Sequence, residues 1–418
     1  KLSGSRLLQI LTTIEIALIP FLTEMEYWGI VLDKKHLYTI SKEVSEKIKK
    51  LTALIYTLAG EEFNISSYQQ VSKILFGKLQ LLERGLRKTK GGVQSTRGSE
   101  LHKLEGKHAI IAPILEYREL QKLKTTYIDV LPSLLSPEDQ RIHTTYNQTG
   151  TVTGRLSSSN PNLQNIPTRT ELGREIRKAF VAAPGFEFLA FDYSQIELRI
   201  AAHLSQDKKM IDAFKRGVDI HALTASEVND IPIEKVTKDL RREAKTLNFG
   251  VLYGMGSRAF AESSGIPKER AKEFIEEYFE DFSGIRTFLD TTKKIAYKNG
   301  FVETMLGRRR YIPELQSPYI QVRLEGERMA INMTIQGTAA DMMKLAMIAI
   351  YKKIISRHES DEIRPILQIH DELVFEIKQG LQKKYEASIK EIMENILPLA
   401  VPVLVDVKVG RSLGELVS

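Results

Sequence analysis

The chain has 418 residues, of which 42% are hydrophobic, enough for one large multi-lobed protein or two to three domains. It contains no cysteine, so disulfide bonds, thiolate zinc sites and cysteine nucleophiles are excluded. The formal net charge of +7 is concentrated in residues 34–130, where 18 Lys and Arg face 10 Asp and Glu. This lobe therefore either grips a phosphate backbone or presents a solvated helical face.

The first third of the chain is predicted to be mostly helical. An apolar helical run covers 7–22, and residues 27–32 are typical of a strand. Periodicity then predicts a long amphipathic helix over 34–58, which ends near Gly60, and helices over 68–82 and about 112–135. A basic glycine-rich loop over 84–92 carries Lys88 and Lys90 and could clamp a duplex. No apolar run reaches the ~18 residues of a membrane helix, so no membrane partner is expected.

Residues 149–167 form a long polar stretch rich in turn-forming residues. A loop of this length inside a compact domain is more often functional than idle. Its hydroxyls and amides, with Arg155 and the nearby Arg169, suit phosphates and base edges. A plain surface loop is the alternative.

Two apolar stretches later in the chain end in carboxylates. A strand is predicted over 186–191 and ends at Asp192, where Ser194-x-x-Glu197 matches a capping box that opens a helix. Strands over 365–369 and 373–377 are joined by His370-Asp371-Glu372 as a tight hairpin turn. The remaining pattern predicts a charged helical region over 229–330, helices over 331–355 and 381–396, and a last strand over 401–409.

The carboxylates of these strands indicate a metal site. If the strands are neighbours in one sheet, Asp192 converges with Asp371 and Glu372, and such a cluster needs cations between its members. Hard oxygen ligands without His or Cys favour Mg²⁺, with Mn²⁺ as a substitute. Two such ions ~4 Å apart form the clamp used for in-line phosphoryl transfer. The pattern therefore predicts two Mg²⁺ ions.

A stripe with a period of four residues lies in the charged helical region. Arg241 and Lys245 come first, and the rings of Phe249 and Tyr253 follow. Cations suit the phosphates of a nucleotide, and aromatic rings suit its base or sugar. Taken alone, the stripe is more typical of an amphipathic surface helix with an aromatic edge than of a nucleotide site. Together with the carboxylates and the basic lobe, it indicates a nucleotidyl transferase.

Three segments resemble the motifs of the family A DNA polymerases, the bacterial DNA polymerase I type. Asp192 to Arg199 is similar to motif A, Arg241 to Gly254 to motif B on the fingers helix, and Gln368 to Glu376 to motif C. Residues 153–158, 162–167 and 336–341 resemble further family segments. The likeness keeps the family order from about residue 10 to about residue 410.

The resemblance implies an α+β right-hand polymerase, with an antiparallel palm sheet, helical fingers and a helical thumb. The palm would comprise 1–33, 131–228 and 331–418, the thumb 34–130 and the fingers 229–330. The implied activity is template-directed addition of dNTPs to a primer 3′-hydroxyl with release of pyrophosphate. The implied partners are a primer–template DNA duplex and dNTPs, bound by a cytoplasmic monomer.

Motif matching also implies roles for individual residues. The metal ligands would be Asp192, Asp371 and the carbonyl of Tyr193, with Glu372 behind them, and Lys245 would protonate the pyrophosphate. The dNTP-binding set would comprise Arg241, Lys245, Phe249, Tyr253, His221, Gln195 and Glu197, the last as a steric gate against a 2′-hydroxyl. The DNA-binding set would comprise Arg155, Arg169, Asn162, Asn165, Asn332, Gln336, His370, Lys88 and Lys90.

Departures and rivals qualify the resemblance. The polymerase-like segment starts almost at residue 1, so neither a 3′–5′ nor a 5′ nuclease is expected. A single-subunit RNA polymerase usually has a small gate residue and a Tyr ring, where this chain has Glu197 and Phe249. A metal-dependent nuclease has no use for the stripe. A non-catalytic DNA-binding relative would be expected to lose Asp192, Asp371 or Lys245, and all three are present.

Overall fold

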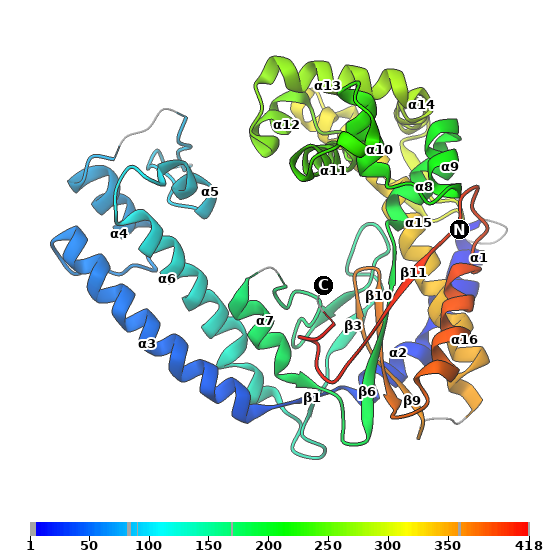
Figure 1. The fold of residues 1–418 in the computed structure, drawn as a ribbon, viewed down its shortest axis with the longest axis horizontal. Helices are drawn as coiled ribbons and strands as arrows, with labels where there is room; N and C mark the ends of the chain where they lie inside the picture. Colours follow the sequence, from blue (N-terminus) through cyan, green and yellow to red (C-terminus); the bar gives the residue numbers. More distant parts are fainter. Residues whose placement is uncertain (1–5, 82–84, 90, 169, 358–360, 417–418) are drawn as a thin grey trace. The chain divides into compact units, whose positions relative to one another are not determined.

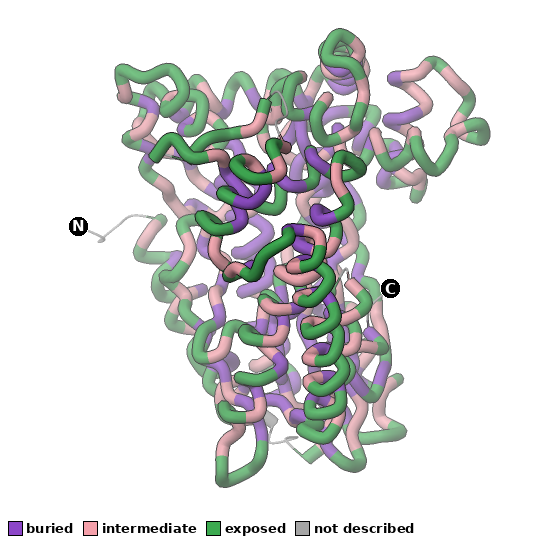
Figure 2. The backbone as a smooth tube through the Cα atoms, turned by 90° about the vertical axis from the view of Figure 1, so that its left-hand side faces the viewer, coloured by how far each residue is buried: buried purple, intermediate pink, exposed green. Residues whose placement is uncertain are grey.

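The chain folds into two compact units, which are described separately. The computed structural model describes residues 6–81, 85–89, 91–168, 170–357 and 361–416. Unit 1 comprises residues 1–29, 143–164 and 183–410, and unit 2 comprises residues 30–142, 165–182 and 411–418. In both units, buried and exposed residues alternate along the helices, as Figure 2 shows. The segments Lys90 and Arg169, expected to bind DNA, lie outside the described residues.

Unit 1 is built on a four-stranded antiparallel sheet in the order β11-β6-β10-β9. Its strands are β6 (Phe186–Tyr193), β9 (Ile363–Ile369), β10 (Glu372–Lys378) and β11 (Val405–Gly410). Phe191 and Phe375 meet edge to face on one side of the sheet, with ring centroids 5.9 Å apart. Three helices, α2 (Ile16–Trp28), α15 (Ile320–Lys353) and α16 (Gln382–Glu394), lie along this side (Figure 1). This side of the sheet is therefore apolar, whereas the opposite side carries polar groups at the strand ends beside the buried Phe188 and Val374.

The N-terminal helix of unit 1 runs without a break from Arg6 to Trp28. It comprises α1 (Arg6–Ile10), a π-helical stretch (Leu11–Glu15) and α2. Its 23 residues have a mean hydropathy of 1.5 over the best window, so by length and composition it could cross a membrane. The helix reaches this length although Glu15 interrupts its apolar run. Leu18 and Phe21 are fully buried in the core of unit 1, which gives the apolar residues of this helix a packing role.

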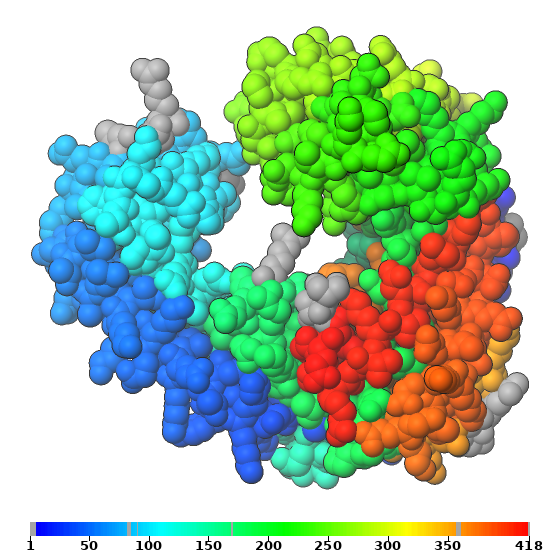
Figure 3. All heavy atoms as spheres, in the orientation of Figure 1, coloured from blue at the N-terminus to red at the C-terminus, as the bar shows by residue number. Residues whose placement is uncertain are grey.

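A second part of unit 1 is helical, as expected for 229–330. Figure 3 shows it in green shades as one continuous mass of atoms. Phe260 and Tyr278 are among its fully buried residues. Its helices are α8 (Ile196–Ser205), α9 (Lys208–Lys215), α10 (Ile220–Val228), α11 (Lys238–Leu252), α12 (Ser257–Ser264), α13 (Lys268–Asp281) and α14 (Ser283–Asn299), with a 3-10 turn over Ile233–Lys235.

Short hairpins and turns complete unit 1. The hairpin of β7 (Phe301–Glu303) and β8 (Arg309–Tyr311) interrupts the region expected to be helical, and a second hairpin joins β3 (Thr145–Asn147) to β4 (Ser157–Ser159). Short 3-10 turns cover Pro313–Gln316 and Ile355–Arg357. Helix α15 begins at Ile320, eleven residues before the expected start at 331. The last strand begins at Val405 and not at 401, and Pro402 lacks the N–H that a strand there would need.

Unit 2 contains the long helix α3 (Lys34–Ala59), which confirms the predicted span. Asp33 caps its N-terminus by accepting hydrogen bonds from two backbone amides, and Gly60 ends it with a left-handed φ of 71°. The other helices are α4 (Tyr68–Ser72), α5 (Gly98–Leu101), α6 (Ile111–Leu123) and α7 (Glu171–Lys178), with π-helical stretches over Lys73–Lys78 and Lys124–Ile128 and 3-10 turns over His102–Leu104 and Leu131–Leu134. A small sheet has the order β2-β1-β5, made of Arg141–Ile142, Ile30–Leu32 and Phe180–Val181.

Candidate active site

The register of the main sheet brings the predicted carboxylates together. Asp192 on β6 lies directly opposite Glu372 on β10. Successive strand residues face opposite sides, so both side chains face away from Phe191 and the covering helices. His370 and Asp371 form the two-residue turn before Glu372, and His370 takes a left-handed φ of 54°. The convergence of the two strands is therefore confirmed, although they lie far apart in the chain.

Burial and repulsion between its members both disfavour ionisation of this carboxylate cluster. Burial, together with the neighbouring carboxylates of Glu372 and Asp371, raises the pKa of Asp192 to about 7. The backbone amide of Tyr193 donates to the carbonyl of Asp371 at 3.1 Å, which fixes the turn against β6. The Tyr193 hydroxyl donates to the carbonyl of Met393, so its ring is buried and only its carbonyl remains as a candidate ligand.

Arg155 extends into this cluster from the polar loop. Its Nη2 donates to Oε1 of Glu197 at 2.7 Å and lies 3.4 Å from Oδ1 of Asp371. A cation thus stands between two carboxylates that would otherwise repel each other. Burial raises the pKa of Glu197, Arg155 opposes that shift, and Asp371 adds to it. The predicted gate and the predicted metal ligand therefore share one guanidinium.

The capping box expected at Ser194 was wrong. Helix α8 begins at Ile196, and its N-cap residue is Gln195, which makes no side-chain capping bond. Gln195 adopts a left-handed φ of 51° and Ser194 lies in the preceding turn. Glu197 therefore uses its carboxylate on Arg155, a partner 42 residues away, and not on its own helix end.

The predicted stripe lies on α11. Thr237 caps this helix, and Arg241, Lys245 and Phe249 lie within it, but Tyr253 is the residue that follows its last turn. Arg241 and Lys245 are exposed and Phe249 is half-buried. Nε of Arg241 donates to Oδ2 of Asp219 at 2.7 Å, so the guanidinium is oriented by the N-cap residue of α10. The stripe is thus a helix face with its cations toward the N-terminus.

His221 stands beside the stripe on the first turn of α10. Its ring centroid lies 5.8 Å from that of Phe249, and the residue is 2% exposed. Burial lowers the pKa of His221 to about 4, although Asp219 opposes the shift. The imidazole is therefore neutral at pH 7.

The depressed pKa of His221 predicts a pH-dependent stability. A histidine in the unfolded chain titrates near pH 6.5. The stability that the folded chain gains by keeping His221 neutral is therefore complete above that pH and is lost as the pH falls toward 4. We expect wild type to lose on the order of 2–3 kcal/mol more than His221→Gln between pH 7 and pH 4.5. Urea unfolding at both pH values, followed by tryptophan fluorescence, measures the difference. Equal losses in the two proteins would contradict the depressed pKa.

The residues expected to bind DNA belong to both units. In unit 1, Asn162 is exposed and His370 forms the turn beside Asp371. Asn332 and Gln336 lie one turn apart on α15, and Oδ1 of Asn332 is buried without a hydrogen-bond partner among the described residues. Asn165 and the exposed Lys88 belong to unit 2, where the Asn165 carbonyl accepts from the Tyr127 hydroxyl at 2.6 Å.

A buried ionic network lies beneath the loop that carries Arg155. Nε of Arg308 donates to Oδ1 of Asp341 at 2.7 Å, and its Nη2 donates to Glu15. Lys344 donates to both carboxylate oxygens of Glu15, at 2.8 and 3.0 Å. Asp341 is 0% and Lys344 1% exposed. Gly154 has a φ of +82°, and a Cβ there would approach the Arg308 side chain to 2.7 Å, so the loop is seated on this network.

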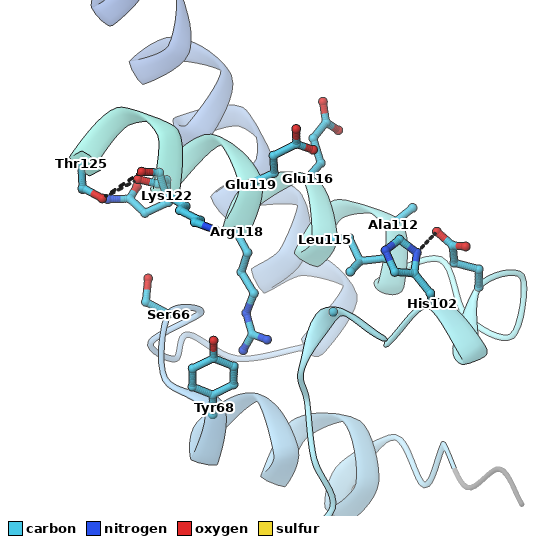
Figure 4. A pocket seen from close by; sticks show the side chains of 13 residues that line it. Ser66, Tyr68, His102, Ala112, Leu115, Glu116, Arg118, Glu119, Lys122 and Thr125 are labelled. Carbon is cyan, nitrogen blue, oxygen red and sulfur yellow. Dashed lines mark hydrogen bonds and ion pairs between the residues drawn. The ribbon is translucent and has the colours of Figure 1, made fainter. Parts of the chain in front are cut away.

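Unit 2 contains a hollow of about 840 Å³. Figure 4 shows Arg118 reaching from α6 across the face of Tyr68, and the guanidinium carbon is 4.6 Å from the ring centroid. His102 and Glu105 form an ion pair at its edge, 3.2 Å apart. The hollow contains none of the predicted site residues.

Comparison with known proteins assigns the chain to a family. Residues 34–415 match the family described as DNA polymerase family A. The chain belongs to this family. Thermostable DNA polymerase I of Thermus aquaticus is 47% identical over 412 residues, which cover 98% of this chain and 49% of that protein. DNA polymerase I of Chloroflexus aurantiacus is 45% identical over 406 residues, 96% of this chain and 43% of that protein.

A solved structure supports the same family A assignment. It is described as the POL domain of Pol1 from M. smegmatis in complex with DNA primer-template and dNTP. It superposes with a TM-score of 0.92 at 41% sequence identity, covering 98% of this chain and 71% of that chain. The resemblance and the α+β right-hand polymerase fold are thereby confirmed. The chain spans about half the length of the curated relatives it matches.

Two polar residues that lie beside the site of this family A chain were not identified from the sequence. Asp406 on β11 lies opposite Asp192 and contributes to raising its pKa. The alternation in Val405-Asp406-Val407 marks its side of the strand, but nothing local indicates the neighbouring strand. Asp219 was missed although Asp followed by a helical pattern is a helix-start signal. Within the described residues, no group of three or more His, Asp or Glu is arranged to hold a metal ion.

Proposed function

We propose that this chain is a template-directed DNA polymerase that adds dNTPs to a primer 3′-hydroxyl and releases pyrophosphate. The convergence of Asp192 with Asp371 and Glu372 across β6 and β10 carries the proposal. The cations of α11 supply the second requirement, a surface for a triphosphate. The structural relative bound to DNA primer-template and dNTP supports the choice of substrates. The bacterial source of the relatives supports a cytoplasmic location, and the enzyme is proposed to act as a monomer.

The family uses divalent metal ions generally, and the donor set here fits Mg²⁺, with Mn²⁺ as a substitute. Asp192, Asp371 and the Tyr193 carbonyl offer hard oxygen donors, and the pKa of Asp192 is raised by burial and then by the neighbouring carboxylates of Glu372 and Asp371. Two bound Mg²⁺ ions would activate the 3′-hydroxyl and stabilise the leaving pyrophosphate. Arg155 lies 3.4 Å from Oδ1 of Asp371, and the second carboxylate oxygen of Asp371 would be the donor to a metal ion.

The remaining roles follow from the positions of the side chains. Arg241 and Lys245 would bind the triphosphate, and Lys245 would donate a proton from Nζ to the leaving pyrophosphate. Phe249 would pack on the sugar, and Tyr253, just past the helix, would border the templating base. Primer and template contacts are proposed for Arg155, Arg169, Asn162, Asn165, Asn332, Gln336, His370, Lys88 and Lys90.

We further propose the domain roles. Unit 2 contains the whole of 34–130, the proposed thumb, whose excess of Lys and Arg suits a phosphate backbone. Unit 1 contains the proposed fingers over 229–330 and the sheet of the proposed palm. The palm is proposed over 1–33, 131–228 and 331–418.

The test is extension of a labelled primer on a DNA template with dNTPs and Mg²⁺. Extension should stop at the position where the template requires an omitted dNTP, because the incoming base is chosen by pairing. Ribonucleotides in place of dNTPs, and single-stranded DNA without a primer, serve as controls. A folded chain that binds the duplex and extends nothing would indicate a non-catalytic DNA-binding relative.

Replacement of Glu197 by Ala is expected to raise ribonucleotide incorporation. The Glu197 side chain is 12% exposed and held by Arg155, so its removal opens space where a 2′-hydroxyl would clash. The ratio of kcat/KM for rNTP over dNTP should rise on the order of tenfold to a hundredfold. The matched control is Glu234→Ala, at an exposed position outside the site. An unchanged ratio, with only a lower melting temperature, would assign Glu197 a structural role.

Replacement of Phe249 by Tyr is expected to relax discrimination against dideoxynucleotides. The added hydroxyl lies on the ring proposed to contact the sugar and can replace the hydrogen bond that a missing 3′-hydroxyl no longer makes. One such bond predicts about a tenfold gain in chain-terminator incorporation. Termination ladders measure it, with Phe279→Tyr on α13 as the control. Unchanged ladders would count against the placement of Phe249 at the sugar.

A further inference from the structure

Three polar side chains form a buried network between α10 and α11. His221 and Thr224 lie on α10 and Asn248 lies on α11, and their exposed fractions are 2%, 0% and 0%. Nδ2 of Asn248 lies 3.1 Å from Nδ1 of His221 and 3.0 Å from Oγ1 of Thr224. Polar groups buried to this extent need hydrogen-bond partners. Their protons can therefore be assigned by matching each donor with an acceptor.

The assignment starts at Thr224. Its hydroxyl has a single proton and two acceptors within reach, the backbone carbonyl of Ile220 at 2.8 Å and Oδ1 of Asn248 at 3.2 Å, and we assign the proton to the shorter contact. Its oxygen therefore accepts from Nδ2 of Asn248, which uses one amide proton. The second amide proton of Asn248 points at Nδ1 of His221. With the amide oriented so that its nitrogen faces the imidazole, Nδ1 is the unprotonated, accepting nitrogen of the ring.

The proton of the imidazole consequently lies on Nε2. The ring is neutral because burial depresses its pKa, and a neutral imidazole carries one N–H. Within the described part of the chain, Nε2 has no hydrogen-bond partner. The charged groups that act on this ring are Asp219, Arg241 and Lys245. Asp219 also accepts a hydrogen bond from Arg241. The imidazole is therefore linked through Asp219 to a side chain that is proposed to bind the triphosphate.

We propose that Asn248 is a positioning residue that fixes His221 as an Nε2–H donor for the triphosphate of the incoming dNTP. This inference rests on the proposed function for its ligand. The tautomer itself follows from contacts inside the protein. Without Asn248, the neutral ring could place its proton on Nδ1 and turn a lone pair toward the phosphate oxygens, which are acceptors only.

The experiment reads tautomer and kinetics in the same proteins. The eight histidines are labelled with ¹⁵N, and long-range ¹H–¹⁵N spectra of the ligand-free chain report which nitrogen of each ring is protonated. His221→Gln assigns the signal. Asn248→Asp keeps the shape but replaces the donor with an acceptor, so Nδ1 should become protonated. The matched control is Asn229→Asp, which makes the same change where Asn229 donates to the Ala225 carbonyl at the end of α10.

We expect Nε2–H in wild type and in Asn229→Asp, and Nδ1–H or a doubly protonated ring in Asn248→Asp. The KM for dNTP should rise about tenfold in Asn248→Asp, the effect of one hydrogen bond to a charged group, with a much smaller change in kcat. In a His221→Gln background, Asn248→Asp should add little to KM, since glutamine has no tautomer to set.

Nδ1–H in wild type, an unchanged tautomer in Asn248→Asp, or an unchanged KM despite a changed tautomer would each overturn the inference. Equal KM effects with and without His221 would also overturn it, because Asn248 would then act through helix packing alone. Should wild type show Nε2–H and yet extend no primer, the proposed function and the triphosphate acceptor would fail. The spectra would still support Asn248 as the residue that sets the tautomer.

Discussion

Replacement of Asp371 by Ala is expected to reduce the rate of primer extension by about 10³-fold or more. A carboxylate that binds catalytic cations contributes several kcal/mol at the transition state, and ~4 kcal/mol corresponds to three powers of ten. Binding of the primer–template duplex should persist, because contacts to the DNA backbone are spread over many side chains. Single-turnover extension at saturating dNTP and Mg²⁺, with duplex affinity measured separately, distinguishes the two effects.

Asp371→Ala is not expected to destabilise the folded protein. The substitution removes one of the groups that raise the pKa of Asp192, and Arg155 keeps its stronger bond to Glu197. The matched control is Asp406→Ala, an exposed carboxylate on β11 opposite Asp192 that we do not place among the ligands. Its rate should stay within a few-fold of wild type. Extension by Asp371→Ala at a rate near that of wild type would contradict the placement of the metal site.

Replacement of Asp341 by Ala is expected to destabilise the protein by about 3–5 kcal/mol. Asp341 is fully buried, and it accepts from Arg308 and from the Thr304 hydroxyl, each at 2.7 Å. Its removal leaves Arg308 and Lys344 to share the single carboxylate of Glu15. One positive charge would then be buried without compensation, which costs far more than the loss of the contact itself.

The single tryptophan, Trp28, lies at the end of α2 in unit 1, so its fluorescence during urea unfolding follows the unit that contains this network. The matched control is Asp239→Ala, which breaks an ion pair with Arg242 whose two side chains are 75% exposed. Exposed pairs contribute at most about 1 kcal/mol. A loss of similar size for Asp341→Ala would show that water or relaxation compensates the charge of Arg308.

Much of the fold could be predicted because its signals are local. Helix α3 begins at the Asp33 cap and ends at Gly60, and both signals lie in the adjacent sequence. The hairpin of β9 and β10 follows from two apolar runs around a short turn. The hairpin of β7 and β8 was missed because Glu303, Arg309 and Arg310 continue the charged composition of the flanking helices. The start of α8 was missed because Glu197 found a distant partner in place of its helix end.

The candidate site divides in the same way. Strand ends marked Asp192 and Asp371, and a period of four marked Arg241, Lys245 and Phe249. The partners that orient these groups are set by tertiary structure. Arg155 reaches Asp371 across 216 positions of the chain, and Asp219 reaches Arg241 across 22. Sequence periodicity contains no information on such pairs, because each depends on how separate elements pack.

The N-terminal helix has a consequence for the choice of fragment boundaries. Glu15 is its contribution to the network that also contains Arg308 and Lys344, and the side chain of Gln148 donates to the same carboxylate. An expression fragment that begins after Glu15 would keep every proposed catalytic residue. It would nevertheless remove the carboxylate to which Lys344 donates and leave Arg308 with Asp341 alone, so the shortest useful fragment must begin upstream of that glutamate.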